Sequence, residues 1–436
     1  MSEDPSPVTG DSETPPASGS GASEYNVRLV VGSLIAGVFF GGVGGGVAFP
    51  TLPTLGTILG IAPVVVGFIL SANRFTRLVM NTPAGQIIDT VGTRKPMIAG
   101  LALQGITPFG YIIGLSPDQI PILDAAGIFF TSRLLWGIGS AFVFTGAFGT
   151  VIHVTTERNR GKWIGYFRGG QSLGFPTGLI LGGILTDLYG YSIAFGVAGL
   201  TGLFAALVAA VVLPDVTPDV SEPARIRELP SIIRADPRIL MIGTVNLGVR
   251  FLFGGIILST IVLYAEVHGI NIGTLSAVGV SGALMAISVL ASGATTVIAG
   301  NLSDRLSNRA FVVIPAMGAL ALGFAALAAV PMLATTVLGV ALIGVGSGGT
   351  NPPLLAYLGD ISPADDVGKM GGVYNVFGDI GSAIGPIVAL PIAARIGYRA
   401  EYALCIGLVV VILVFVIRTL LGDPEPRVSQ ATLSDD

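Results

Sequence analysis

The amino-acid sequence predicts an all-α membrane protein with 12 transmembrane helices in two pseudo-symmetric six-helix bundles. Three observations support this prediction. The 436 residues are 52% hydrophobic and only 11% charged, whereas soluble domains carry about 25% charged residues. Twelve apolar stretches are long enough to cross a bilayer as helices, which takes about 20 residues each. Several short motifs also occur twice, in the same order, at similar spacings.

The apolar stretches define the predicted helices in chain order. They cover residues 27–50, 61–83, 96–115, 122–151, 162–186, 190–213, 239–264, 274–300, 309–329, 332–358, 370–394 and 401–421. The glycines and prolines within them are compatible with membrane helices, where small residues let backbones approach closely.

Polar segments divide the chain into domains. The linker 214–238 separates an N-terminal bundle, 27–213, from a C-terminal bundle, 239–421. Residues 1–26 are rich in Ser, Pro, Gly and acidic residues, so we expect a disordered N-terminal tail without a signal peptide. Residues 422–436 form a second short tail.

The distribution of Lys and Arg predicts the orientation, because such residues concentrate in cytoplasmic loops. The loops and ends on the side of the N-terminus hold 15 of them: Arg28, Arg94, Lys95, Arg158, Arg160, Lys162, Arg225, Arg227, Arg234, Arg238, Arg305, Arg309, Lys369, Arg418 and Arg427. The opposite loops hold only Arg395 and Arg399. We therefore expect a multi-pass protein of the cell membrane with both termini in the cytoplasm.

A charged segment after the second apolar stretch occurs twice. The first copy contains Gly85, Asp89, Gly92, Arg94 and Lys95. The second copy, 215 residues later, retains Gly300, Asp304 and Arg309 but has Ser307 and Ala310 in place of the middle glycine and the last base.

This segment resembles the signature loop of the major facilitator superfamily, Gly-x-x-x-Asp-x-x-Gly-x-Arg-Lys/Arg, which joins the second and third helices. The resemblance implies two six-helix bundles around a central cavity that opens alternately to either side. It also places the weaker copy between the eighth and ninth helices.

Further pairs of motifs support the duplication. The pairs are Phe40-Gly41-Gly42 with Phe253-Gly254-Gly255, Gly137-Ile-Gly139-Ser140 with Gly344-Val-Gly346-Ser347, and Gly190-Tyr191 with Gly397-Tyr398, at offsets of 213, 207 and 207 residues. Internal repeats of this kind are typical of secondary transporters.

Ionisable residues inside the apolar stretches are candidates for a cavity, since a charge in the bilayer core costs about 2.5–3.5 kcal/mol or more. These residues are Arg74, Arg77, Arg133, Arg168, Arg250 and Asp379. A shift of 211 residues aligns Arg168 with Asp379, so we predict that these two charges face the cavity and approach each other in at least one state. The alternative is that each pairs within its own half or extends to the interface.

Arg133 begins Arg133-Leu-Leu-Trp-Gly137-Ile-Gly139-Ser-Ala141, which is similar to the family's fourth-helix motif linked to proton coupling. Because arginine keeps its proton, its expected role is to set the pKa of a nearby acid or to hold a water chain. Alternatively, Arg133 binds neighbouring carbonyl groups.

Proline and glycine motifs predict packing sites or hinges. Pro50 and Pro53 resemble the two-proline end of the first helix in twelve-helix drug–proton antiporters. Gly174 and Pro176 are similar to the glycine-proline motif of family exporters, which Phe175 interrupts, whereas Gly385-Pro386 keeps the pair. Pro352 lacks the N–H that a helix needs, which predicts a hinge or a static kink.

The signature segment suggests a latch. Asp89 could accept hydrogen bonds from Arg94 or from a helix N-terminus of the other half, and would then hold the cytoplasmic gate shut. The alternative is a charged turn that only sets topology.

Secondary active transport of a small organic solute, as proton-coupled export, is the function that these features favour. The alternative is ion-coupled uptake of an organic anion, because arginine binds carboxylates well; a non-transporting sensor is a third possibility. Without a Walker motif or a cluster of His and carboxylates, we expect no catalytic residues, cofactor or metal. The partners we expect are a small-molecule substrate, protons and the lipid bilayer, with no nucleic acid, and we expect a monomer.

Overall fold

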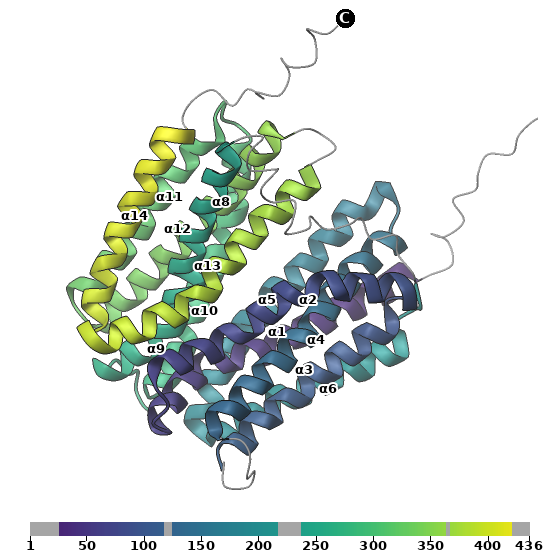
Figure 1. The fold of residues 1–436 in the computed structure, drawn as a ribbon, viewed down its shortest axis with the longest axis horizontal. Coiled ribbons are helices and arrows are strands. Elements are labelled where there is room, and N and C mark those ends of the chain that lie inside the picture. Colours follow the sequence, from purple (N-terminus) through teal and green to yellow (C-terminus); the bar gives the residue numbers. More distant parts are fainter. Residues whose placement is uncertain (1–25, 117–123, 217–236, 363–366, 421–436) are drawn as a thin grey trace, which may run out of the picture.

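The computed structural model describes residues 26–116, 124–216, 237–362 and 367–420. Within these residues the chain is helical apart from short turns, and it forms two bundles side by side (Figure 1). The predicted fold class is confirmed. The linker 214–238 is described only at its two ends, and the tails 1–26 and 422–436 lie outside the described residues except for Asn26.

In residues 26–116 and 124–216, six helices form the N-terminal bundle. They are α1 (Val27–Ile58), α2 (Pro63–Val91), α3 (Arg94–Gly114), α4 (Ala125–Val154), α5 (Glu157–Tyr189) and α6 (Tyr191–Val212).

The described residues from 237 onwards also form six spans, which make up the C-terminal bundle. The first is continuous through α8 (Pro237–Arg250), the π-helix η3 (Phe251–Ile257) and α9 (Leu258–Val267), and it is followed by α10 (Ala277–Ser303), the 3-10 turn η4 (Arg309–Val312) with α11 (Val313–Ala329), α12 (Leu333–Ile361), α13 (Val367–Ile396) and α14 (Tyr398–Leu420).

Eleven spans in the described part of the chain are long and apolar enough to cross a membrane. The helix outside this set is α5, which includes Arg160, Lys162 and Arg168 in its first half. Its length of 33 residues is close to the 32 of α1 and the 30 of α4, so the charges lower its hydropathy without shortening it.

Several predicted helix ends were wrong. Helix α1 continues to Ile58, so Pro50 and Pro53 lie inside it. Helix α2 continues to Val91 and includes Gly85 and Asp89, so only Gly92 and Thr93 of the first signature segment lie between helices. Hydropathy marks where the apolar stretch ends, whereas a helix can extend further because its backbone hydrogen bonds do not depend on lipid.

The two bundles repeat the same helix crossings. A methyl group on Gly42 of α1 would lie 3.0 Å from the backbone nitrogen of Phe175 in α5. At the corresponding crossing in the other bundle, a methyl group on Gly255 of η3 would lie 2.6 Å from the Gly385 Cα of α13. Gly190 and Gly397 end α5 and α13 with the same positive φ of 85°, which favours glycine.

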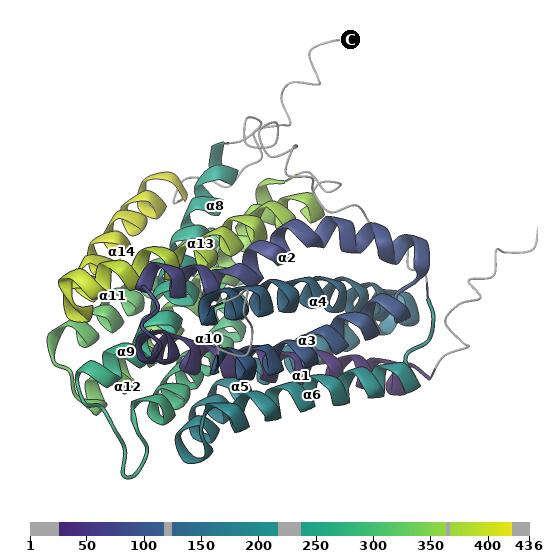
Figure 2. The same cartoon turned by 60° about the horizontal axis from the view of Figure 1, so that its bottom comes forward.

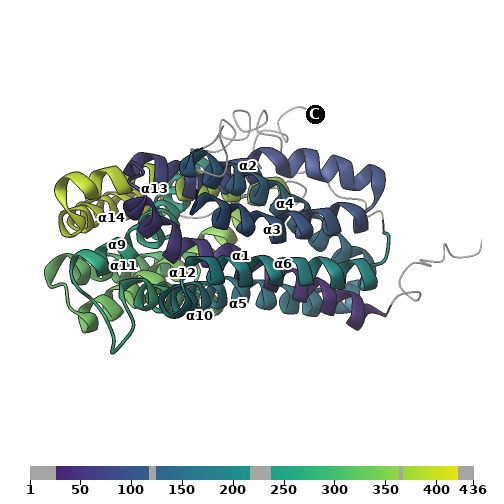
Figure 3. The same ribbon diagram turned by 90° about the horizontal axis from the view of Figure 1, so that it is seen from below.

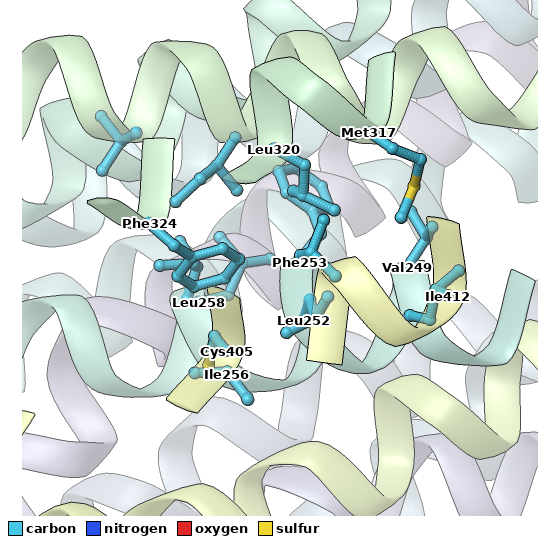
Figure 4. Packing of buried hydrophobic residues seen from close by; sticks show 14 of the residues in the cluster. Val249, Leu252, Phe253, Ile256, Leu258, Met317, Leu320, Phe324, Cys405 and Ile412 are labelled. Carbon is cyan, nitrogen blue, oxygen red and sulfur yellow. The ribbon is translucent and has the colours of Figure 1, made fainter. Parts of the chain in front are cut away.

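The largest apolar core lies mostly in the C-terminal bundle but includes Phe49 and Leu179 of the N-terminal bundle, and two smaller cores lie mostly in the N-terminal bundle. In the C-terminal bundle, Leu252, Phe253 and Leu258 pack against Leu320 and Phe324 of α11 (Figure 4). Cys405 of α14 is also buried in this core. On the outer faces, large apolar side chains such as Val79 and Val211 are exposed, which is typical of a surface that contacts lipid.

Candidate functional site: a cavity between the bundles

A cavity of about 980 Å³ lies between the two bundles. Residues of α1, α2, α4 and α5 line it on one side, and residues of η3, α10, α12 and α13 line it on the other. Its size is within the range of about 300–1,000 Å³ that is usual for small-molecule sites. Both halves of the duplicated chain therefore contribute to one site.

One end of the cavity, which we call the closed end, is where the bundles touch. Here α2 packs on α13 and α5 packs on α10 (Figures 2 and 3). Gly67 of α2 lies against the backbone of Pro386 and Ile387, and a methyl group on it would lie 2.7 Å from the Ile387 Cα. Gly183 of α5 would similarly meet the Val278 carbonyl oxygen at 2.9 Å.

Polar contacts reinforce the closed end. The Ser71 hydroxyl donates to the Ala383 carbonyl at 2.5 Å. At the start of α10, the Ser276 N–H donates to the Asp187 carboxylate of α5 at 2.9 Å. A carboxylate at a helix N-terminus is favoured by the unpaired N–H groups and the helix dipole, so Asp187 fastens α5 to a helix of the other bundle.

The opposite end, which we call the open end, carries both signature segments, and there the bundles diverge (Figure 1). In the first segment, Arg94 donates to the Ala210 carbonyl of α6 at 2.7 Å. Gly92 has a φ of 80°, and the Thr93 N–H donates to the Val216 carbonyl at 2.9 Å. Asp89 has no hydrogen bond or ion pair to any described residue. The predicted bond from Arg94 to Asp89 is therefore not made in this structure.

The second signature segment is held by ion pairs. Arg309 contacts Asp304, which follows α10, and its Nε donates to Asp360 of α12 at 2.7 Å. Gly300 lies in the last turns of α10. The α4–α12 offset of 207 residues relates Asp360 to His153, so the N-terminal bundle has no carboxylate at the matching position.

Four of the six predicted intramembrane arginines and acids surround one point of contact between the bundles. Arg77 of α2 and Asp379 of α13 form an ion pair of 2.8 Å, and their side chains are 31% and 26% exposed. Arg77 also lies over the Phe144 ring, 5.9 Å from its centroid. Asp379 is the only acidic residue that lines the cavity among those described.

Arg74 and Arg250 lie beside this pair. Arg74 donates to the Gly254 carbonyl at 3.4 Å, within the π-helix η3, where the altered hydrogen bonding of the backbone is often associated with functional sites. Arg250 is the last residue of α8 and immediately precedes this π-helix, and a methyl group on Gly378 would lie 3.3 Å from the Arg250 Cγ. The Arg250 guanidinium has no hydrogen bond or ion pair to a described residue.

Arg168 and Arg133 differ from the prediction in their surroundings. Arg168 lines the cavity and lies over the Phe148 ring, but Asp379 pairs with Arg77 instead, so an approach of Arg168 to Asp379 stays a prediction for another state. Arg133 is 1% exposed, lies outside the cavity lining, and donates to the Leu70 carbonyl at 3.4 Å. Its position matches the alternative in which it binds a carbonyl group.

The predicted packing residues lie at crossings or inside helices. A methyl group on Gly137 of α4 would contact Asn73 of α2, and one on Gly139 would contact Gly100 of α3. Gly174 abuts the Phe39 backbone of α1. Pro176, Pro352 and Pro386 are each inside a continuous helix.

The sequence analysis did not identify the uncharged polar residues that line the cavity, nor the carboxylates of Asp187 at the closed end and Asp360 at the open end. Asn73, Gln104, Gln171 and Asn351 line the cavity, and amides within apolar stretches were the signal that could have found them. Asp187 and Asp360 lie at helix ends, where an acid looks like ordinary surface charge. Within the described ranges, no group of three or more His, Cys, Asp and Glu side chains could hold a metal.

Comparison with known proteins adds a family to this geometry. A family model described as Major Facilitator Superfamily matches residues 34–294 and 274–435. Multidrug resistance protein 1 of Bacillus subtilis (strain 168) is 27% identical over 184 residues, which are 42% of this chain and 44% of that protein. Quinolone resistance protein NorA of Staphylococcus aureus (strain MRSA252) is 22% identical over 167 residues, 38% of this chain and 40% of that protein. The matched segments thus cover less than half of these relatives.

Solved structures share the fold. A bacterial homologue of the human lysosomal transporter Spinster, in an inward-facing and occupied conformation, has a TM-score of 0.71 at 15% identity and covers 90% of this chain and 97% of that one. The human organic anion transporter MFSD10 (TETRAN) has a TM-score of 0.60 at 19% identity, over 90% of this chain and 100% of that one.

Proposed function

Because the chain belongs to the Major Facilitator Superfamily and is a transporter of that family, we propose that it exports a small organic solute by proton-coupled alternating access. The observation that carries this proposal is the cavity between two related bundles, which touch at one end of it and diverge at the other. Rocking of the bundles about this cavity is how duplicated transporters expose one site to each side in turn.

Export is supported by the names of the relatives, two of which are a multidrug resistance protein and a quinolone resistance protein. The open end carries the signature segments, and the excess of basic loops on the same side supports placing it in the cytoplasm. The protein is then in the state that receives solute from inside the cell. Since one chain encloses a whole cavity, a monomer in the cell membrane suffices.

Proteoliposomes test the proposal. Inside-out protein should concentrate a solute in the lumen when the lumen is made acidic, and an ionophore that abolishes the pH gradient should stop the uptake. Liposomes with Gly183→Leu protein, in which the closed end cannot form, serve as the matched control. Transport that ignores the pH gradient, or that runs with the protons, contradicts proton-coupled export.

A second candidate is uptake of an organic anion, favoured by the excess of arginine over acid in the cavity. It predicts that solute and protons move in the same direction. The same vesicles distinguish the two candidates. A transporter that moves solute and protons in the same direction accumulates solute in the lumen when the exterior is acidic, whereas proton-coupled export requires an acidic lumen.

A further inference from the structure

The cavity has more positive charge than its own residues can neutralise. Arg74, Arg77, Arg168 and Arg250 line it, and Asp379 is the only acid among the described lining residues. Asp379 already binds Arg77. Arg74 has one long hydrogen bond to a carbonyl, and among the described residues Arg168 has only the Phe148 ring as a partner of its guanidinium.

Three of these arginines share one region. Arg74 and Arg77 are three residues apart, which places them on the same face of α2. Arg250 packs beside Gly378, the neighbour of Asp379. Around one carboxylate there are thus three guanidinium groups, contributed by both bundles.

Alternating access makes this imbalance significant. When both ends close around a solute, water leaves the cavity, and unpaired charges become costly because the local dielectric falls. An anion would remove this cost, since guanidinium binds carboxylate and phosphate groups with paired hydrogen bonds. A cationic solute would increase the cost.

We infer that the cavity binds a small organic anion whose acidic group replaces Asp379 on Arg77, with Arg74 and Arg250 completing the site. This inference rests on the proposed transport function and names the charge of its substrate. Asp379 then acts as an internal substitute that neutralises Arg77 while the site is empty. The ion pair between the bundles breaks when substrate arrives, so binding and movement of α2 relative to α13 are linked.

The charge of the ligand can be tested with probes of equal size. Hexanoate, hexanamide and hexylamine differ mainly in charge at neutral pH. Trp136 lines the cavity, and the chain has only two tryptophans, so a Trp163→Phe background gives a fluorescence signal from the cavity. Hexanoate should bind at least about tenfold more tightly than the other two probes, because a charged hydrogen bond is worth about 1.5–3 kcal/mol.

Asp379→Asn is the decisive variant. If Asp379 competes with the ligand, the substitution frees Arg77 and hexanoate binds several-fold more tightly, a gain that misfolding cannot produce. Arg77→Gln and Arg250→Gln should each weaken hexanoate binding about tenfold or more. Arg395→Gln is the matched control. Arg395 lies near the end of α13, the helix that contains Asp379, and its substitution should leave hexanoate binding unchanged.

Two results overturn the inference: hexanoate binding no better than hexanamide, or weaker hexanoate binding in Asp379→Asn. The inference and the proposed function can fail separately. Anion binding without any transport contradicts the function alone, whereas transport of only neutral or cationic solutes contradicts the inference alone.

Discussion

The two ends of the cavity are built from different interactions. At the closed end, glycines bring backbones of opposite bundles together, as at Gly67 and Gly183, and Asp187 caps a helix of the other bundle. At the open end, the charged groups of the signature segments bind within their own bundles, and Asp89 has no described partner. Backbone packing thus holds the bundles together at the closed end. At the open end, charged groups are available to form contacts between the bundles.

This difference gives the two gates different sensitivities. A close backbone crossing cannot form when a side chain is added to the glycine, because the opposing backbone atoms cannot shift without distorting their helix. A charged gate, in contrast, depends on single hydrogen bonds of about 1.5–3 kcal/mol each. Substitutions at the two ends should therefore affect transport to different degrees and in opposite conformational directions.

The largest effect is expected from Gly183→Leu. The new side chain would collide with Val278 and Gly279 of α10, so the closed end could not form and transport should fall to background. Gly196→Leu, where a side chain meets open space, is the control and should retain activity. Normal transport by Gly183→Leu protein would show that the bundles need not touch there.

A smaller effect is expected from Asp89→Asn. If Asp89 joins the other bundle when the open end closes, losing its charge should slow transport about tenfold at unchanged protein level. Asp304→Asn is a matched comparison and should do less, because Arg309 keeps Asp360 as a partner. An Asp89→Asn rate equal to wild type would reduce the segment to a topology signal.

A shift of conformation with modest loss of rate is expected from Asp187→Asn. Removing a carboxylate from a helix N-terminus costs about 1 kcal/mol, which changes the ratio of the two states about fivefold. Labelling of a cysteine placed at Tyr189 should become faster in this variant. Unchanged labelling would mean that glycine packing alone determines the state.

The smallest effect is expected from Arg309→Gln. Its partners Asp304 and Asp360 are 68% and 40% exposed, and exposed ion pairs contribute about 0–1 kcal/mol. We expect a fall in the thermal midpoint of no more than about 4 °C. A larger fall would show that this cluster supports the whole C-terminal bundle.

The sequence predicted the architecture better than it predicted the partners. Hydropathy and the repeated motifs gave the six-plus-six arrangement, because bilayer thickness fixes span length. Both Arg77 and Asp379 were predicted to line the cavity, but their ion pair was not predicted. The predicted approach of Arg168 to Asp379 stays a prediction for another state, because aligned positions in a repeat show equivalence and not contact. Arg133 was predicted to line the cavity. The sequence could not show that it is buried within the N-terminal bundle, because this burial depends on how α2 and α4 pack. Hydropathy also did not show that α1 extends past Pro50 and that α2 extends past Gly85.

The measurement that tests the central claim most directly reports both ends of the cavity with labels on α5, on α10 and in the turn that precedes α10. In a Cys405→Ala background, spin labels at Tyr166 and Leu302 report the open end, and labels at Tyr189 and Ile272 report the closed end. The two distances should change in opposite directions when a transported solute or a pH gradient is applied. Distances that stay fixed, or that lengthen together at both ends, would contradict alternating access about this cavity.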